Sequence, residues 1–419
     1  MAGRYKPYPE YKDSGVDWIG KIPCDWDMWK ITHACPYVAS GTTPKADGDV
    51  YYGGENLWVT TGELREGVIF DTLKKVTDKA LLDMPTLRLH PRGSVSIAMY
   101  GATIGRLGIF GKEAATNQAC CVMPPSATIQ NKYLFYWLYA TRQEIINLSS
   151  GGGQPNVNQE KIASLKVSCP NYNLQTTIAN FLDHETAKID TLIEKQQQLI
   201  ELLKEKRQAV ISHAVTKGLS SLNGGPNAKL RDSSVEWLGE VPEGWVVGRY
   251  KFCTDRIVVG IAEAATHAYA DSGVPIIRST NIKEEGLDTA GMLFITEEFA
   301  EKNSSKYLYA NDVITVRTGY PGISAVIPKS LHQSQCFTNL VATPNNSMLP
   351  EFLAEYLNSH TGKSYFDLLG WGSAQKNISV PILQNIPIAY PVKDEQFKII
   401  EFIRKARWKF SVLIDKAEK

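Results

Sequence analysis

The sequence lacks the features of several protein classes. Its seven cysteines are an odd number, and no two have the spacing of a metal-binding pair, so we expect reduced thiols, no disulfide framework and no metal site. Its apolar runs, such as residues 95–99 and 257–261, are far below the ~20 residues of a membrane span. No apolar export signal follows Arg4 and Lys6. We therefore expect a cytoplasmic protein without membrane contact.

An excess of positive charge is missing as well. The 45 basic and 44 acidic residues give a net charge of +1, which does not by itself indicate a nucleic-acid-binding protein. Cations can still gather in one cleft, so this sum is a weak test. The hydrophobic content of 43% is enough for packed cores, and 419 residues exceed one typical core. Two or more folded domains are therefore expected.

Catalytic motifs are also absent. An amino-methyltransferase needs a glycine-rich cofactor loop and an Asn/Asp-Pro-Pro-aromatic segment, and neither MPPS at 123–126 nor CPNY at 169–172 fits. No Walker-type loop and no carboxylate-lysine cluster of nuclease spacing occurs. Residues 101–105 resemble a phosphate loop, but no Lys and Ser/Thr follow, which favours a turn. We expect no catalytic residue in this chain.

The sequence repeats itself after 219 residues. DSGVDWIG at 13–20 corresponds to DSSVEWLG at 232–239. Matches continue along the chain, with an offset of 221 near the end of each copy, and they include the pairs Pro23–Pro242, Trp26–Trp245, Gly67–Gly286, Gly101–Gly319, Asn156–Asn377 and Gln175–Gln396. Such a period is too long for a solenoid, so each copy should be a domain followed by a connecting element.

The connecting element reads as a long helix. After Pro170 the sequence loses glycine and proline, and apolar residues recur in steps of four and three, which predicts a coiled-coil seam. The helix should end near Lys217-Gly218, because a glycine after a lysine is a stop signal. The same pattern returns between Ile399 and Ala417 without a counterpart of residues 199–217.

Two like modules usually pack about a two-fold axis, which would set these helices antiparallel. The predicted interface of the helix pair consists of Ile178, Leu182, Ile189, Leu192, Leu199, Leu203, Ile399, Ile403, Phe410 and Leu413. Charged residues between them are most simply a solvated face.

Short β-rich runs separated by glycine turns, followed by helical patterns, make each module α+β. The stretch 220–227 is rich in Ser, Gly, Asn and Pro and reads as a linker. The predicted boundaries are a first module at 1–170, a helix at 171–218, a linker at 219–231, a second module at 232–391 and a shorter helix at 392–419.

Several segments carry a family resemblance. They are, in order, DSGVDWIGKIPCDWDMWKI, VTTGELREG, YGATIGRLGIF, TNQACCVMPPS and GGGQPNVNQEKIASLKVSCPNYNLQTTIANFLDHETAKIDTLI. Together they resemble the specificity subunit of type I restriction-modification systems, and the likeness covers essentially the whole chain. The resemblance implies two pseudo-two-fold-related target-recognition domains, separated by long antiparallel coiled-coil helices.

In that family each recognition domain reads one part of a bipartite double-stranded DNA target, and the helices fix the gap. The resemblance implies two methyltransferase subunits and restriction-translocase subunits as partners, and adenine as the methylated base. S-adenosylmethionine, ATP and Mg²⁺ are then expected on those partners, and no cofactor in this chain. A function in DNA recognition without catalysis follows.

Loops with glycine, small hydroxyls, amides and isolated cations suit contact with phosphates and base edges. The candidates in the first module are Thr60, Thr61, Tyr100, Thr103, Arg106, Asn117, Gln118, Gln154 and Asn156. Those in the second module are Arg278, Ser279, Asn281, Arg317, Tyr320, Asn339, Gln375, Lys376 and Asn377. Each of these residue types also serves in turns and helix caps, which is the alternative interpretation.

The two copies differ in their cations. Arg278 corresponds to Val59, and Arg317 falls near Met99. Arginine forms paired hydrogen bonds with guanine, whereas asparagine and glutamine form them with adenine. Because the two copies differ at these positions, the sequence predicts an asymmetric bipartite target. The repeated tryptophans, Trp18, Trp26, Trp237 and Trp245, favour scaffold packing over base stacking.

Two other functions are compatible with parts of this pattern. A fused restriction-methylation enzyme would need catalytic domains for which 419 residues leave no room. A purely structural coiled-coil scaffold would bind protein, and binding that is indifferent to DNA sequence would favour it.

Overall fold

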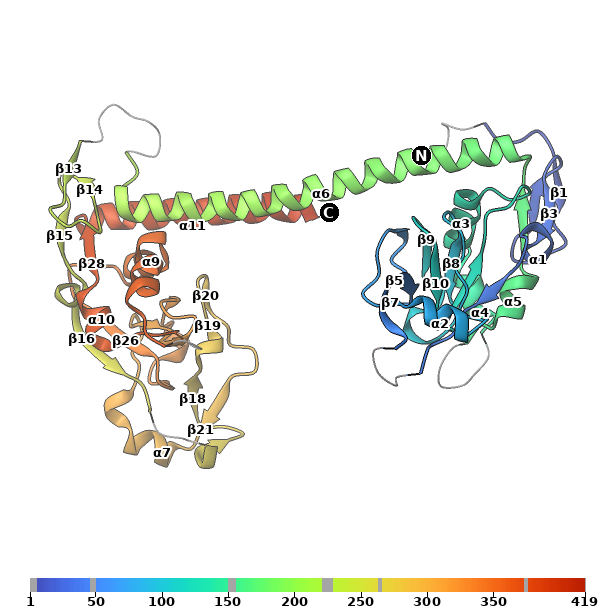
Figure 1. Cartoon of the computed structure of the whole chain (residues 1–419). Helices are drawn as coiled ribbons and strands as arrows, with labels where there is room; N and C mark the ends of the chain where they lie inside the picture. Colours follow the sequence, from blue (N-terminus) through green and yellow to red (C-terminus); the bar gives the residue numbers. More distant parts are fainter. Residues whose placement is uncertain are drawn as a thin grey trace. The chain divides into compact units, whose positions relative to one another are not determined.

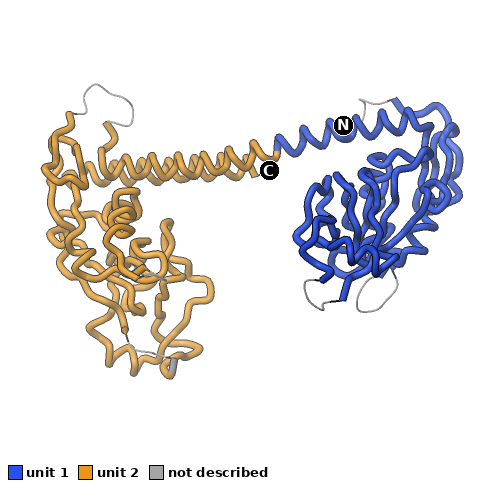
Figure 2. The backbone as a smooth tube through the Cα atoms, viewed as in Figure 1, with its two compact units in different colours: residues 1–192 blue, residues 193–419 orange. Residues whose placement is uncertain are grey.

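The computed structural model describes residues 6–45, 50–149, 156–220, 229–262, 266–372 and 376–418. The chain divides into two compact units, residues 1–192 and 193–419 (Figure 2). The division falls inside α6 (Tyr172–Lys217), a continuous helix of 46 residues. Each unit contains one copy of the repeat.

A five-stranded sheet lies at the centre of the first unit, in the order β4-β11-β8-β9-β6 (Figure 1). Its strands are β4 (Ala39–Ser40), β11 (Cys120–Met123), β8 (Val95–Ala98), β9 (Leu107–Phe110) and β6 (Gly67–Ile69). Only β6 and β9 are parallel. A second sheet comprises β10 (Ala114–Thr116), β5 (Tyr52–Val59) and β7 (Lys75–Val76), with β10 parallel to β5.

Helices and two strand pairs complete the first unit. The strand pairs are β1 (Tyr11–Asp13) with β2 (Lys21–Pro23), and β3 (Asp27–Lys30) with β12 (Lys166–Cys169). The helices are α1 (Ile31–Ala34), α2 (Asp78–Asp83), the 3-10 turn η1 (Gly101–Thr103), α3 (Asn131–Ala140), α4 (Arg142–Asn147) and α5 (Gln159–Ser164).

The central sheet of the first unit is covered on both faces. Every residue of β8 and β11 is buried. Because successive side chains of a strand point to opposite faces of the sheet, adjacent residues pack in the cores on opposite sides of it. Ile97 packs with Leu134 of α3 on one face, whereas Ala98 packs with Val59 of β5 on the other. Full burial explains why four of the five residues at 95–99 are apolar, Ser96 being the exception.

The second unit repeats this architecture. Its central sheet has the order β16-β26-β22-β24, from β16 (Thr254–Val259), β26 (Leu340–Pro344), β22 (Val313–Thr315) and β24 (Ser324–Val326). The second sheet comprises β17 (Tyr269–Ala270), β21 (Leu293–Ile295), β18 (Val274–Ile277) and β25 (Gln335–Cys336), with β18 and β25 parallel. The parallel pair therefore occurs in both copies.

Four short strand pairs and several helices accompany these sheets. The pairs are β13 (Leu230–Asp232) with β14 (Glu240–Pro242), β15 (Val246–Arg249) with β28 (Pro387–Tyr390), β19 (Ile282–Lys283) with β20 (Gly286–Leu287), and β23 (Thr318–Gly319) with β27 (Lys376–Asn377). The helices are α7 (Glu297–Lys302), α8 (Pro350–Asn358), α9 (His360–Leu369), α10 (Val380–Asn385) and α11 (Lys393–Glu418). The 3-10 turns are η2 (Tyr250–Cys253), η3 (Thr266–Ala268), η4 (Ser279–Asn281), η5 (Ser304–Lys306) and η6 (Lys329–Leu331).

The α+β class that the sequence predicts is confirmed, and the repeat extends to single hydrogen bonds. The Ser14 hydroxyl accepts from the Val16 N–H at 3.2 Å, and the Ser233 hydroxyl accepts from the Val235 N–H at 3.1 Å. The matching serines of the DSGV and DSSV segments therefore build the same turn.

A buried glutamine fixes the start of each long helix. The Gln396 amide donates to the carbonyls of Pro391 (2.9 Å) and Ser347 (3.0 Å), and its oxygen accepts from the Leu349 N–H (2.8 Å). Gln175 makes the equivalent three bonds in the first unit. Both side chains are almost completely buried, so each amide ties its helix to the module that precedes it.

In the second unit, α6 and α11 pack side by side and antiparallel (Figure 1). The Gln196 amide donates to the carbonyl of Ala417 near the end of α11. Nineteen residues later, Val215 shares a core with Ile399 near the start of α11. The predicted antiparallel pairing is confirmed for this part of α6.

The buried face of α11 differs in detail from the predicted seam. Leu413 is exposed, whereas Ile414 and Ala417 are buried. Because α11 also packs against α8, its apolar face follows two neighbours rather than one. Ile399 and Ile403 are buried in this shared core.

The other seam residues occupy varied environments. Ile178 packs against the core of the first unit. Leu182, Leu203 and Phe410 are half-buried, and the exposed members of the predicted seam on α6 are Ile189, Leu192 and Leu199. The α6 seam is therefore not one uniform contact surface within the two units.

The repeated tryptophans contribute to scaffold packing. Trp245 is buried against Phe352, and its indole N–H donates to the Glu395 carboxylate at 3.1 Å. Trp18 packs against Trp137 with ring centres 5.7 Å apart. Within the described part of the chain, no helix combines the length and apolar composition that crossing a membrane requires.

Candidate nucleic-acid interface

In the first unit, strand pairing gathers several of the predicted DNA-contacting residues. The parallel strands β5 and β10 end together, with Val59 opposite Thr116. The N–H of Asn117 then bonds the carbonyl of Val59 at 3.0 Å. The loop after β5, with Thr60 and Thr61, therefore lies beside the loop after β10.

Local hydrogen bonds shape these two loops. The backbone N–H of Thr60 bonds the Glu63 carboxylate at 2.9 Å, which closes a turn. The Asn117 side chain accepts from the Ala119 N–H at 3.1 Å, and the Thr43 hydroxyl donates to the exposed Gln118 side chain. Thr60 and Asn117 thus combine turn roles with partial exposure.

A third loop, between β8 and β9, lies at the same end of the sheet. The N–H of Met99 bonds the carbonyl of Ala119, at 2.8 Å, and so links this loop to the one after β10. Tyr100 forms a β-bridge with Asn156, and the hydroxyl of Thr103 donates to the Tyr100 carbonyl at 3.2 Å. The exposed candidates Arg106 and Asn156 complete this group, which the fold brings together from distant parts of the chain.

In the second unit, the equivalent turn follows β18 and comprises residues 278–281, called the reading turn below. The Ser279 hydroxyl donates to the Asn339 side chain at 2.8 Å. The Asn281 side chain accepts from the Arg278 N–H at 3.0 Å and donates to the Asp288 carbonyl at 2.9 Å. Asn281 and Asn339 are buried, so their amides hold the turn from inside while Arg278 and Ser279 remain partly exposed.

The remaining candidates of the second unit that the structure describes, Arg317, Tyr320, Lys376 and Asn377, lie in or next to β23 and β27. The Ile378 N–H bonds the Arg317 carbonyl at 3.0 Å, which places Arg317 at this strand pair. Tyr320 and Lys376 are exposed, and the Lys376 ammonium lies 3.2 Å from the Asp367 carboxylate. These residues are near the end of β22, which pairs with β26 next to Asn339.

The repeat is visible in this part of each unit. Tyr100 pairs with Asn156 in the first unit, and Thr318 pairs with Asn377 in the second. The sequence match between the two asparagines is therefore also a match in strand pairing. Two further candidates, Gln154 and Gln375, lie outside the described residues.

The charge of the two candidate surfaces differs. The Nε atoms of Arg278 and Arg317 are buried and have no hydrogen-bond partner among the described residues. A buried N–H without an acceptor costs free energy, which suits a site completed by a ligand with acceptor atoms. At the matching positions of the first unit, Val59 and Met99 are buried in the core.

Two glycines that the sequence analysis did not single out shape both sites. A Cβ on Gly41 would lie 1.8 Å from the carbonyl oxygen of Thr116, and a Cβ on Gly260 would lie 2.3 Å from that of Cys336. Only glycine permits this close crossing of the central sheet and the parallel strand pair. The two glycines are 219 residues apart, so they occupy matching positions when the sequence is compared with itself at that offset.

Six of the seven cysteines are buried, and Cys24 is exposed. Burial raises the pKa of Cys35 to about 11 and that of Cys120 and Cys336 to about 12, so these thiols stay protonated at neutral pH. Within the described ranges, no group of three or more His, Cys, Asp and Glu side chains is placed to hold a metal ion. The buried cysteines act as small core residues.

Comparisons with known proteins agree with this architecture. A family model described as the type I restriction modification DNA specificity domain matches residues 23–202 and 263–407. The type I restriction enzyme MjaVIII specificity subunit of Methanocaldococcus jannaschii is 22% identical over 415 residues, covering 95% of this chain and 91% of that protein. The EcoKI specificity subunit of Escherichia coli is 22% identical, covering 92% and 83%.

Another relative matches over a shorter part of the chain but with a higher sequence identity. The MjaIX specificity subunit of the same archaeon is 29% identical over 202 residues, which is 47% of this chain and 44% of that protein. Among solved structures, the HsdS subunit from Thermoanaerobacter tengcongensis superimposes with a TM-score of 0.57 at 15% identity, covering 95% of this chain and 93% of that one. A chain from a study of assembly and conformational transition of the type I R-M system gives 0.60, also at 15% identity, covering 95% and 94%. At this identity the two structures show the shared fold.

We predict that Gly260→Ala lowers the free energy of unfolding by at least ~3 kcal/mol, because the methyl group would overlap a backbone carbonyl. Gly244→Ala is the matched control, since its Cβ would meet open space, and it should change stability by less than ~0.5 kcal/mol. Urea denaturation of the full chain measures both. Equal stability of the two variants would contradict the proposed crossing.

Proposed function

The chain belongs to the family of the type I restriction modification DNA specificity domain, and we propose that it is the subunit that selects the DNA target of such a complex. The curated relatives that span most of the chain are named specificity subunits. The observation that carries the proposal is that each unit builds a corresponding group of loops, with hydroxyls, amides and cations, at a matching end of its central sheet. Such loops suit contact with base edges and phosphates.

The proposed target is bipartite and asymmetric. Two modules with one scaffold provide two reading surfaces, and Arg278 and Arg317 of the second have aliphatic counterparts in the first. Arginine binds guanine through two acceptors in the major groove. We therefore expect guanine in the half-site read by the second module, and a different sequence in the other half-site.

The helices are proposed to set the gap between the half-sites. At 1.5 Å per residue, the 46 residues of α6 extend for roughly 70 Å. Over part of its length α6 is reinforced by α11, and a paired helix resists bending better than a loop. The proposed target therefore has a gap of fixed length between its half-sites, and the base sequence of the gap is not recognised.

The chain is proposed to act through partners in the cytoplasm. Its family provides recognition and not catalysis, so methylation and cleavage require other subunits. We propose that two methyltransferase subunits and the restriction-translocase subunits assemble on it. S-adenosylmethionine, ATP and Mg²⁺ would then be bound by those subunits, and adenine would be the methylated base.

Mapping of methylated bases in a genome tests the proposal directly. When the chain is co-expressed with its methyltransferase partner, we expect methylation at one two-part motif with a constant gap. The methyltransferase alone should produce no such motif. Methylation that follows no sequence would instead support a structural scaffold.

The arginines of the second unit should control one half-site only. We expect Arg278→Ala or Arg317→Ala to reduce discrimination against wrong bases there by ~1–3 kcal/mol, roughly 5- to 150-fold. Methylation of oligonucleotides with single-base changes in either half-site measures this effect. Lys329→Ala removes an exposed cation outside the candidate loops and serves as control. A loss spread evenly over both half-sites would argue against base contact by these arginines.

A heptad inserted between Leu192 and Ile193 tests the role of the helix. Seven residues add ~10 Å and keep the helix face within ~20°. Since the insertion precedes the part of α6 that packs with α11, that packing should persist. We expect the gap of the methylated motif to grow by about three base pairs, at 3.4 Å per step. A motif of unchanged gap would reject the helix as the measure of distance.

A further inference from the structure

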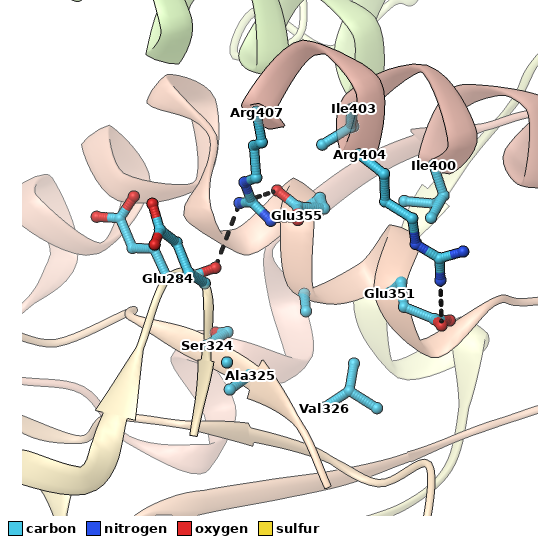
Figure 3. A pocket seen from close by; sticks show the side chains of 13 residues that line it. Glu284, Ser324, Ala325, Val326, Glu351, Glu355, Ile400, Ile403, Arg404 and Arg407 are labelled. Carbon is cyan, nitrogen blue, oxygen red and sulfur yellow. Dashed lines mark hydrogen bonds and ion pairs between the residues drawn. The ribbon is translucent and has the colours of Figure 1, made fainter. Parts of the chain in front are cut away.

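The hairpin β19–β20 of the second unit ends in two glutamates that are held from three helices. The Lys363 ammonium of α9 lies 2.6 Å from the Glu284 carboxylate, and the Arg207 guanidinium of α6 lies 3.1 Å from that of Glu285. Arg407 of α11 donates to the backbone carbonyl of Glu284 at 3.3 Å (Figure 3). The hairpin tip is thus connected to both long helices.

Arg407 is itself fixed in place. Its guanidinium binds both carboxylate oxygens of Glu355 on α8, at 2.6 and 2.9 Å (Figure 3). Glu355 is buried, and burial raises its pKa to about 7, although the charge of Arg407 opposes this rise. A bidentate pair restricts the guanidinium to one orientation, so the second N–H of its Nη2 atom is directed at the tip.

Apolar packing does not fill the space beneath the tip. A pocket of about 440 Å³ lies there, lined by the glutamates, by β24 and by residues of α8 and α11 such as Ile400 (Figure 3). Side chains next to such a space have few neighbours that limit their movement. The base of the hairpin is anchored by Ile282 and Leu287, which pack in an apolar core, whereas the tip itself is held by its ion pairs and hydrogen bonds.

The hairpin continues directly from the reading turn. The turn ends at Asn281, and β19 begins at Ile282. Two further bonds tie the turn to the segment after β20: Asn281 donates to the Asp288 carbonyl at 2.9 Å, and the Arg278 guanidinium donates to the Gly291 carbonyl at 3.2 Å. A shift of the hairpin would thus displace Arg278.

The matching acid of the first unit is held differently. Glu66 corresponds to Glu285 at the offset of 219 and forms an ion pair with Arg142. Arg142 belongs to α4, a helix of the module itself, whereas the partner of Glu285 belongs to the long helix α6. The contact between hairpin and long helix is therefore a property of the second copy.

We propose that Arg207, Lys363 and Arg407 act on the hairpin tip as positioning residues, which hold the reading turn at a fixed orientation to the two long helices. This inference rests on the proposed function, because the turn must read DNA for its orientation to matter. The position at which the second half-site is read then depends on ion pairs that do not themselves contact the DNA. The first half-site does not depend on them.

The double variant Glu284→Gln/Glu285→Gln tests this inference in the full chain with its methyltransferase partner. The glutamines keep the size and polarity of the two side chains but remove the negative charges that Lys363 and Arg207 bind. We expect discrimination against single-base changes in the second half-site to fall about tenfold. Targets with the gap altered by one base pair should be methylated more readily, while discrimination in the first half-site stays unchanged.

Two controls separate positioning from stability. Glu298→Gln breaks an ion pair with Lys302 on α7 of the same unit and should leave both half-sites unaffected. The exchange variant Glu285→Arg/Arg207→Glu restores the ion pair with the two charges exchanged. Its discrimination in the second half-site should be higher than that of either single variant, Glu285→Arg or Arg207→Glu. A merely structural role would lower the melting temperature and affect both half-sites together.

The outcomes distinguish this inference from the proposed function. Unchanged discrimination in the glutamine variant, or an equal loss in both half-sites, would overturn the positioning role. If the unaltered chain directs methylation to no two-part motif, the proposed function itself fails. A loss confined to the second half-site, recovered by the exchange variant, supports the inference.

Discussion

The buried glutamine at the start of each long helix is the constraint on which the rest of the structure depends. One amide binds three backbone groups of the preceding module, and it lies where water does not compete. Because a helix is straight over many turns, a small change of angle at its start becomes a large displacement at its end. Gln175 and Gln396 therefore fix the direction in which each helix leaves its module. A rigid joint at this position is what the proposed role of the helices in setting the gap requires.

The duplication separates the parts that must agree from the parts that must differ. The serine turn, the glycine crossing and the parallel strand pair occur in both copies, because each of them sets the backbone of the scaffold. The cations are placed differently, with Arg278 and Arg317 in one copy and aliphatic residues in the other. One scaffold can thus present two surfaces of different charge without a change of fold.

Local charge matters more in this protein than net charge. A total of +1 conceals ion pairs with separate tasks, such as the pair of Arg207 with Glu285 and the bidentate pair of Arg407 with Glu355. An exposed pair alone contributes little to stability. Joined at one hairpin tip and supported by a buried carboxylate, such pairs define an orientation instead. Electrostatics then acts on geometry rather than on the free energy of folding.

The sequence by itself determined the duplication, the α+β class, the long helix and the family, because repeats, strand patterns and helical periods are properties of neighbouring residues. It also matched Asn156 with Asn377, which the strand pairing repeats. Only the tertiary structure decided that Asn281 and Asn339 turn inward, that α11 buries Ile414 rather than Leu413, and that Glu285 meets Arg207. An amide in a turn can face solvent or bind backbone, and a helix can bury either of two adjacent residues. The choice depends on neighbours that are distant in the chain, and their positions exist only after folding.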